Sequence, residues 1–197
     1  MITKLGPHII KPTPAAMRWA QKAHIVKAMD TVAPFEVAQD HAIRIFRHHF
    51  GDQSLNKNPQ HIAGEIIESL KGYRHKNLVV EVYNEIPRTL TAVHAAMLIE
   101  VVPILKREGL RVGGPCWSTG DYEAEDFELM RSRKWCGLDF LFMHAYWGLP
   151  VGLPMDDIFT PWNALRWRRW WKPGDPPVVV TETGRDMVRD GAGGVYV

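Results

Sequence analysis

Two glutamates, Glu85 and Glu182, each lie at the end of a short apolar run, far apart in the chain. The first run reads NLVVEVYNE from residue 77, and the second reads PVVVTETG from residue 177. Both are rich in β-branched residues and bounded by turn formers, which predicts buried parallel strands. Carboxylates at the ends of such strands gather on the face where α/β sheets and barrels carry their chemistry. Because two convergent carboxylates suffice to hydrolyse a glycosidic bond, this reaction is our first hypothesis.

The elements that would position these glutamates alternate between strands and helices. Thr13-Pro14 and Asn58-Pro59 each offer an N-cap followed by a first-turn proline, which predicts a helix start at both places. The predicted strands are residues 4–10, 23–29, 42–48, 77–85, 111–117, 138–146 and 177–182. The predicted helices are residues 14–22, 34–40, 58 onwards, 89–108, 125–135 and 158–171. Seven alternations indicate an α/β fold, a (β/α)8 TIM-type barrel, built by a single catalytic domain over residues 1–197.

The sequence does not clearly provide the eighth strand that such a barrel needs. Residues 193–197 have strand character, but the stretch between Gly184 and Gly193 is too short for a helical crossover of roughly a dozen residues. We therefore expect a barrel that is incomplete after the seventh strand, closed by a stub or completed by another chain. An unpaired strand edge invites pairing with a neighbour. The expected consequence is either a homo-oligomer that covers the edge or a barrel of low stability.

Composition narrows the class of protein. The 197 residues are 46% hydrophobic and 23% charged, as in ordinary folded domains. A net charge of +2 gives no reason to expect a nucleic-acid partner. We find neither a secretory signal nor an apolar run of about 18 residues, so we expect no membrane association and, by default, a cytoplasmic protein, with export by another route left open. Cys116 and Cys136 are expected to be free thiols, and no cofactor is expected.

Three short motifs carry a resemblance to a known family. Asn84-Glu85 ends the fourth predicted strand, His144-Ala-Tyr146 ends the sixth, and Glu182 ends the seventh. This order resembles clan A of the retaining glycoside hydrolases, which are TIM barrels. The resemblance implies that Glu85 is the acid/base and Glu182 the nucleophile of an O-glycosyl hydrolase that acts by double displacement. It also implies that Tyr146 hydrogen-bonds the nucleophile.

The residue types fit this chemistry. A retaining mechanism needs one protonated carboxyl group to donate to the leaving oxygen and one ionised carboxylate to attack the anomeric carbon. We expect the two groups about 5–6 Å apart at the C-terminal end of the strands. Asn84 would hydrogen-bond a sugar 2-hydroxyl group. Arg47, at the end of the third predicted strand, would support an ionised Glu182, although clan A enzymes usually have such an arginine after the second strand.

Aromatic side chains are the expected stacking surfaces for a carbohydrate substrate. Trp147 directly follows Tyr146, and Trp117 ends the fifth predicted strand. We include both, with His144, in the expected substrate-binding site. Four further tryptophans, at positions 162, 167, 170 and 171, lie near helical spacing and are expected to be mostly core.

Three other functions stay open. The run RWRRWWK from residue 166 would suit nucleic acid or a membrane interface, but a solvated helix face with buried tryptophans explains it more simply.

A metal-dependent TIM-barrel hydrolase would use histidines and acids at strand ends, yet the first strand offers only His8, so we expect no metal. A catalytically weak or inactive barrel that binds glycan is favoured by the incomplete eighth strand and opposed by the Glu85/Glu182 pair.

Overall fold

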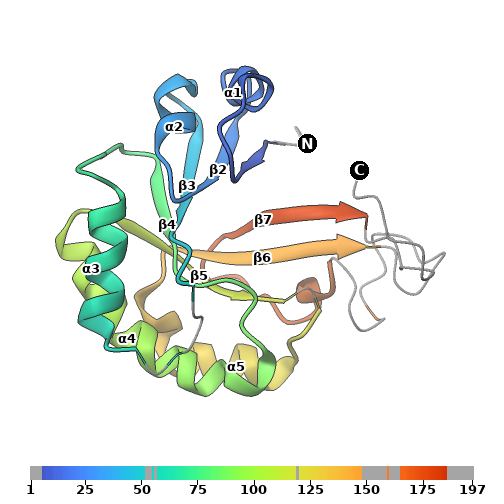
Figure 1. Cartoon of the computed structure of the whole chain (residues 1–197). Helices are drawn as coiled ribbons and strands as arrows, with labels where there is room; N and C mark the ends of the chain where they lie inside the picture. Colours follow the sequence, from blue (N-terminus) through green and yellow to red (C-terminus); the bar gives the residue numbers. More distant parts are fainter. Residues whose placement is uncertain are drawn as a thin grey trace.

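The computed structural model describes residues 6–51, 55, 57–118, 120–147, 159 and 165–185, with the backbone alone at residues 146, 147 and 183–185. In these residues, seven parallel strands form one sheet in chain order (Figure 1). The strands are β1 (His8–Ile9), β2 (Ile25–Met29), β3 (Ile43–Arg47), β4 (Leu78–Glu81), β5 (Arg111–Trp117), β6 (Phe140–Trp147) and β7 (Val178–Arg185). Each overlaps a predicted strand, so the predicted parallel α/β alternation is confirmed.

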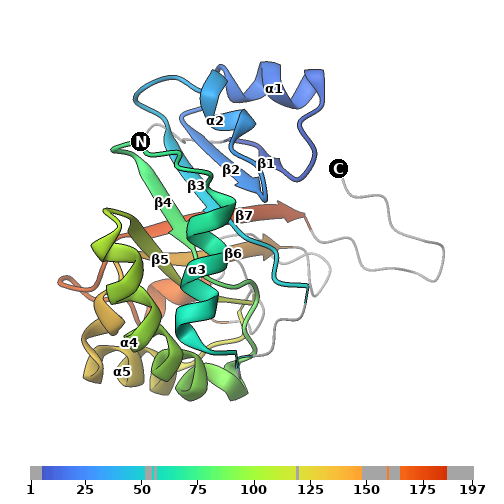
Figure 2. The same ribbon diagram turned by 60° about the vertical axis from the view of Figure 1, so that its left-hand side comes forward.

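Helices lie on the outside of the curled sheet (Figures 1 and 2). The α-helices of the described residues are α1 (Pro14–Ala20), α2 (Ala33–Val37), α3 (Pro59–Ser69), α4 (Thr91–Arg107) and α5 (Ala124–Ser132). Short 3₁₀ turns are η1 (Arg88–Leu90), η2 (Lys134–Gly137) and η3 (Arg166–Arg169). The two predicted N-caps are present, because Thr13 accepts from the backbone N–H of Ala16 at 3.3 Å and Asn58 from that of Gln60 at 2.8 Å.

Alternation along the strands sends two kinds of side chain into the barrel interior. Ile45, Val79 and Phe142 form a small buried apolar cluster, which the free thiol of Cys116 completes. Two positions further along the same three strands come three polar residues, Arg47, Glu81 and His144. Residues two apart on a strand point to the same side of the sheet. The interior therefore has two layers, the apolar cluster and, next to it along the strands, a charged layer that includes Arg47, Glu81 and His144. The larger apolar core lies between the sheet and the helices.

The sheet forms a nearly closed barrel, as the TIM-type prediction required. In the described residues, β1 pairs with β2 and β7 pairs with β6, without backbone pairing between β1 and β7. Side chains of these two strands nevertheless meet, since Nδ1 of His8 lies 3.5 Å from Oε1 of Glu182. Strand β7 continues to Arg185, beyond its predicted end. The predicted strand at residues 193–197 lies outside the described residues.

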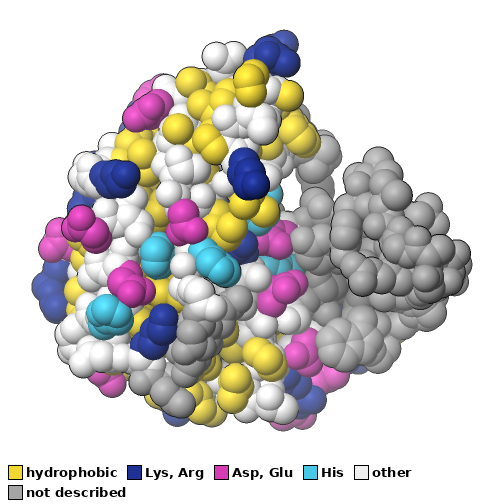
Figure 3. Space-filling model, in the orientation of Figure 1, with side chains coloured by type: hydrophobic (Ala, Val, Ile, Leu, Met, Phe, Trp, Pro, Cys, Tyr) yellow, Lys and Arg dark blue, Asp and Glu magenta, His cyan; other side chains and the backbone are white. Residues whose placement is uncertain are grey.

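The described part of the predicted helix 158–171 is not an α-helix, because residues 166–169 form the single 3₁₀ turn η3. Arg166 is buried, and its Nη1 donates to the carbonyl oxygens of Gly120 and Tyr122 at 3.0 and 2.9 Å. The ring of Trp170 packs edge-on against Tyr122. This arginine–tryptophan run is thus built partly into the core. On the face shown in Figure 3, Lys and Arg side chains are scattered among acidic and histidine side chains.

One helical segment, Arg88–Arg107, is long and apolar enough to cross a membrane by length and composition alone. This finding corrects the expectation that the chain contains no apolar run of about 18 residues. In the folded domain, α4 buries one face that includes Leu98, Val102 and Leu105. A buried helix of a folded domain passes the same composition test, and α4 packs as such a helix against α3 and β5.

Candidate active site

Glu182, on β7, has its carboxylate in the charged layer. Its Oε1 accepts hydrogen bonds from Nζ of Lys27 at 2.7 Å and from Nη1 of Arg47 at 2.8 Å. Burial alone would raise the pKa of Glu182, but the positive charges of His144 and Lys27 outweigh burial and lower this pKa to about 2. Glu182 is therefore ionised at neutral pH, as an attacking carboxylate must be.

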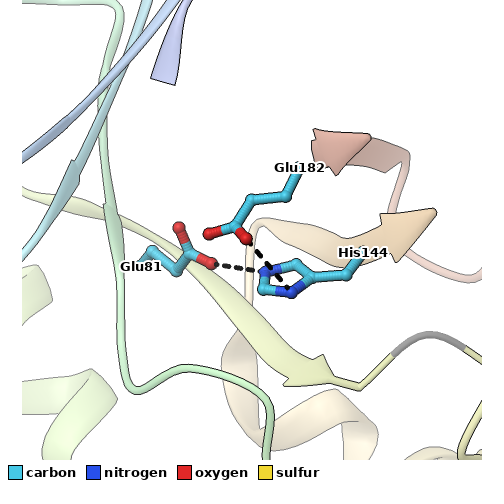
Figure 4. A group of neighbouring side chains, drawn as sticks. All are labelled: Glu81, His144 and Glu182. Carbon is cyan, nitrogen blue, oxygen red and sulfur yellow. Dashed lines mark hydrogen bonds and ion pairs between the residues drawn. The ribbon is translucent and has the colours of Figure 1, made fainter. Parts of the chain in front are cut away.

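His144, on β6, contacts three carboxylates, two of which appear in Figure 4. Its Nε2 lies 3.4 Å from Oε1 of Glu81, and its Nδ1 lies 3.3 Å from Oε1 of Glu85 and 3.6 Å from Oε2 of Glu182. Burial would lower the pKa of His144, but the hydrogen bonds to Glu81 and Glu85 raise it overall. The imidazole thus joins the acidic residues of β4, the loop after β4, and β7 into one cluster.

Glu85 lies in the loop after β4, because this strand ends at Glu81 and is shorter than predicted. Its backbone φ of 48° is in the left-handed region, where a residue with a side chain is strained. The loop is held to β5, since Ile86 bridges to Trp117 and the hydroxyl of Ser118 donates to the carbonyl oxygen of Glu85 at 3.2 Å. The Glu85 side chain is 45% exposed, so it is open to a substrate.

The two predicted catalytic glutamates approach the same nitrogen. Because Nδ1 of His144 is 3.3 Å from Oε1 of Glu85 and 3.6 Å from Oε2 of Glu182, these oxygens are no farther apart than the sum of the two distances. Retaining glycosidases hold their carboxyl groups about 5–5.5 Å apart, and inverting enzymes about 6.5–9.5 Å. For these two oxygens, the bound includes the retaining separation.

Arg47 connects the neighbourhoods of the two glutamates. Its Nη1 donates both to Oδ1 of Asn84 and to Oε1 of Glu182. It is the last residue of β3, where the sequence predicted it, and so it does not follow the second strand as in clan A enzymes. Through this one guanidinium, the amide beside Glu85 and the carboxylate of Glu182 are held together.

Trp117 does not line the site, which corrects the prediction that it stacks on a sugar. The side chain is 0% exposed, and its Nε1 donates to Oγ1 of Thr91 at 3.1 Å. Its ring packs against Tyr122 and Phe127 in the core beside the helices. Because the indole of Trp117 is fully buried among these neighbours, it cannot offer a ring face for stacking on a sugar. Tyr146 and Trp147 belong to β6, but their side chains lie outside the described part of the structure.

Two buried charged residues complete the cluster, and neither belongs to the motifs that predicted the site. Glu81 ends β4 and is 0% exposed, and Lys27, on β2, is 2% exposed. Nζ of Lys27 lies 2.5 Å from Oε2 of Glu81. Burial would raise the pKa of Glu81, but Lys27 and His144 hold it well below its usual range. The available signal was a single charged residue in each of two otherwise apolar strands, IVKAM and LVVE.

His8 is a neutral neighbour of Glu182. Burial, with help from the Lys27 ammonium, lowers the pKa of His8 to about 4. At neutral pH its contact with Glu182 is therefore not an ion pair.

Glu81, His144 and Glu182 each offer an atom that binds metal ions, and these atoms lie within 4.8 Å of one another. The ammonium of Lys27, however, lies 2.5 Å from Oε2 of Glu81 and 2.7 Å from Oε1 of Glu182, so one positive charge already neutralises both carboxylates. A divalent ion at these residues would be repelled by this ammonium and by the guanidinium of Arg47. The donor set therefore suits the lysine better than a metal.

Comparison with solved structures finds carbohydrate-active barrels. A β-mannanase from Streptomyces thermolilacinus matches with a TM-score of 0.52 and 15% sequence identity, over 91% of this chain and 68% of that chain. A structure of β-mannanase from the same organism with mannohexaose matches with a TM-score of 0.56 and 14% identity, over 91% and 67%. The GH39 enzyme from Xanthomonas axonopodis pv. citri matches with a TM-score of 0.52 and 14% identity, over 89% and 49%. The chain has the barrel fold of these enzymes.

These neighbours are glycoside hydrolases of clan A, the clan that the motif order resembles. No protein-family model matches the sequence, and no curated protein matches it. The chain spans about half the length of the GH39 enzyme. At identities of 14–15% the solved structures show the fold alone, and the resemblance of this chain to clan A rests on the order of its motifs.

Proposed function

We propose that this barrel is a retaining glycoside hydrolase with Glu182 as its nucleophile and Glu85 as its acid/base. The observation that carries the proposal is the approach of both carboxylates to Nδ1 of His144, from β7 and from the loop after β4. A shared fold does not by itself prescribe a function, whereas these side chains are the groups that the reaction requires. A carbohydrate substrate is supported by the neighbours, one of which was solved with mannohexaose.

The reaction would proceed in two displacements. First, Oε2 of Glu182 bonds to the anomeric carbon while the bond to the leaving oxygen breaks, and that oxygen keeps the electron pair and takes the proton of Glu85. Oε1 of Glu182 stays with Lys27 and Arg47. Next, Glu85 takes a proton from water, whose oxygen attacks the same carbon and releases Glu182. Two inversions at one carbon retain its configuration. Asn84, held by Arg47, would bind a hydroxyl group next to that carbon.

A panel of aryl glycosides that begins with β-mannosides tests this assignment, with the product anomer identified by NMR. Glu182→Gln should lower turnover by several orders of magnitude because no nucleophile remains. Glu85→Gln should spare the first step for activated leaving groups, which need little protonation. Glu100→Gln, on the exposed face of α4, is the matched control and should behave as the wild type. Equal and modest losses from Glu182→Gln and Glu85→Gln would indicate structural roles instead.

The alternatives make different predictions in the same assay. If the barrel binds glycan without cleaving it, the wild type and Glu182→Gln should bind oligosaccharides equally well, and neither should release aryl alcohol.

A metal-dependent hydrolase would lose its activity after chelation. The proposed mechanism predicts that chelation changes nothing, because Lys27 and Arg47 supply the positive charge beside Glu182.

A further inference from the structure

Two carboxylates share the ammonium of Lys27, and only one of them would react. Nζ lies 2.5 Å from Oε2 of Glu81 and 2.7 Å from Oε1 of Glu182. Lys27 is 2% exposed, and a buried charge is costly unless it is paired and hydrogen-bonded. The two carboxylates are therefore the counter-charges that offset the burial of this ammonium.

Glu81 is the inner partner and cannot touch a substrate. Its side chain is 0% exposed, and its strand is paired on both sides, through Arg47 of β3 and Gly113 of β5. Its Oε1 lies 3.4 Å from Nε2 of His144 and 3.5 Å from Oγ1 of Thr181. Its Oε2 has no hydrogen-bond partner among the described residues, and its close contact with Nζ of Lys27 is a charge contact rather than an aligned hydrogen bond.

The charge of Glu182, in contrast, would not be constant. In the proposed first step, its carboxylate becomes an ester to the anomeric carbon and is neutral until water cleaves that ester. During this interval Lys27 loses one of its two counter-charges. A buried charge left without a partner costs far more than the loss of the pair as a whole.

We propose that Glu81 is a positioning residue that acts as the permanent counter-ion of Lys27, so that Glu182 can lose its charge without leaving a buried ammonium unpaired. This inference rests on the retaining function proposed above. It assigns a purpose to a carboxylate that lies in the centre of the site but out of reach of the sugar.

A stability cycle tests the counter-ion without any need for activity. Glu182→Gln imitates the neutral ester and should be tolerated, because Glu81 remains beside Lys27. Glu81→Gln leaves Glu182 as the partner. The double variant removes both charges, so its unfolding constant should rise at least tenfold more than the two single changes combined. Urea unfolding at pH 7 provides the measurement.

In a Lys27→Met background, the double variant should no longer show a rise beyond that of the two single changes combined. The reason is that no buried ammonium is then left without a counter-charge. The pair Glu100→Gln and Glu182→Gln is the matched control and should be additive, since Glu100 is on the exposed face of α4. Additive effects of Glu81→Gln and Glu182→Gln in the presence of Lys27 would overturn the inference, whether or not the wild type hydrolyses glycosides.

Kinetics provide the second arm. Glu81→Gln should slow formation of the glycosyl-enzyme about 10–100-fold with little change in KM, because the residue does not contact the sugar. Lys27→Met combined with Glu81→Gln removes both charges and should be faster than Glu81→Gln alone, with Arg47 still on Glu182. A double variant no faster than Glu81→Gln would contradict the counter-ion role and leave Glu81 as an ordinary structural residue.

Discussion

His94, on α4, makes the stability of this barrel sensitive to mild acid. The side chain is 0% exposed, and neither ring nitrogen has a hydrogen-bond partner among the described residues. Burial lowers the pKa of His94 from 6.5 to about 3. The folded protein therefore holds this imidazole neutral at a pH where the unfolded chain has already protonated it.

The sign and size of the effect follow from this difference. Above pH 6.5 both states are neutral at His94, and the residue adds no pH dependence. As the pH falls below 6.5, the unfolded state binds a proton that the folded state refuses until about pH 3, so stability is lost in this window. At pH 5 the loss relative to pH 8 amounts to about 2 kcal/mol, which is large against a typical total of about 5–15 kcal/mol.

Urea unfolding of the wild type and His94→Gln at pH 8, 7, 6 and 5 measures this loss. With a slope of about 2 kcal/mol per molar urea, the wild-type midpoint should fall about 1 M more than that of the variant between pH 8 and pH 5. The other titrating groups are common to both proteins and cancel. His61→Gln, at a side chain that is 62% exposed, is the control and should follow the wild type. Parallel curves for the wild type and His94→Gln would refute the reasoning.

Two further predictions concern Trp117 and the ionisation of Glu182. Trp117→Phe should lower the free energy of unfolding by about 1–3 kcal/mol, through the lost hydrogen bond to Thr91 and a small cavity, and should leave KM unchanged; a large rise in KM would return Trp117 to the sugar site. Because the pKa of Glu182 is about 2, kcat/KM should not decline through protonation of the nucleophile between pH 7 and pH 4. Arg47→Met removes one cation beside Oε1 and should raise the pKa of Glu182, so that the acidic limb of the pH profile lies at a higher pH in the variant than in the wild type.

The strands could be predicted because each is a short β-branched or apolar run, and such runs form buried parallel strands wherever helices cover the sheet. Their boundaries were less certain. Strand β4 ends at Glu81 although the apolar pattern continues to Tyr83, whose backbone has a positive φ of 68° and leaves the strand. Glu85 thereby moves from a strand end to a loop, where its carboxyl group is exposed. A local break of this kind depends on how the loop meets β5, which no pattern within β4 contains.

The inner half of the site could not be predicted for a related reason. Lys27 and Glu81 are visible in the sequence as charges within apolar strands, but their partners lie on distant strands. Whether such a residue faces the interior or the helices depends on register, which a single sequence does not specify. Trp117 was misjudged in the same way, because the end of β5 turns its side chain toward Thr91 and the helices.

The contacts of Glu182 explain why the strand that carries the arginine matters less than expected. In a barrel, inward-facing residues from different strands converge, so several strands can reach one carboxylate. His8 of β1, Lys27 of β2 and Arg47 of β3 all lie within 3.5 Å of Oε1 of Glu182 on β7. The chemistry requires positive charge beside that oxygen, and both β2 and β3 supply it, through Lys27 and Arg47. Because β1 and β7 have no backbone pairing in the described residues, these contacts across the interior also connect the first part of the sheet to its last strand.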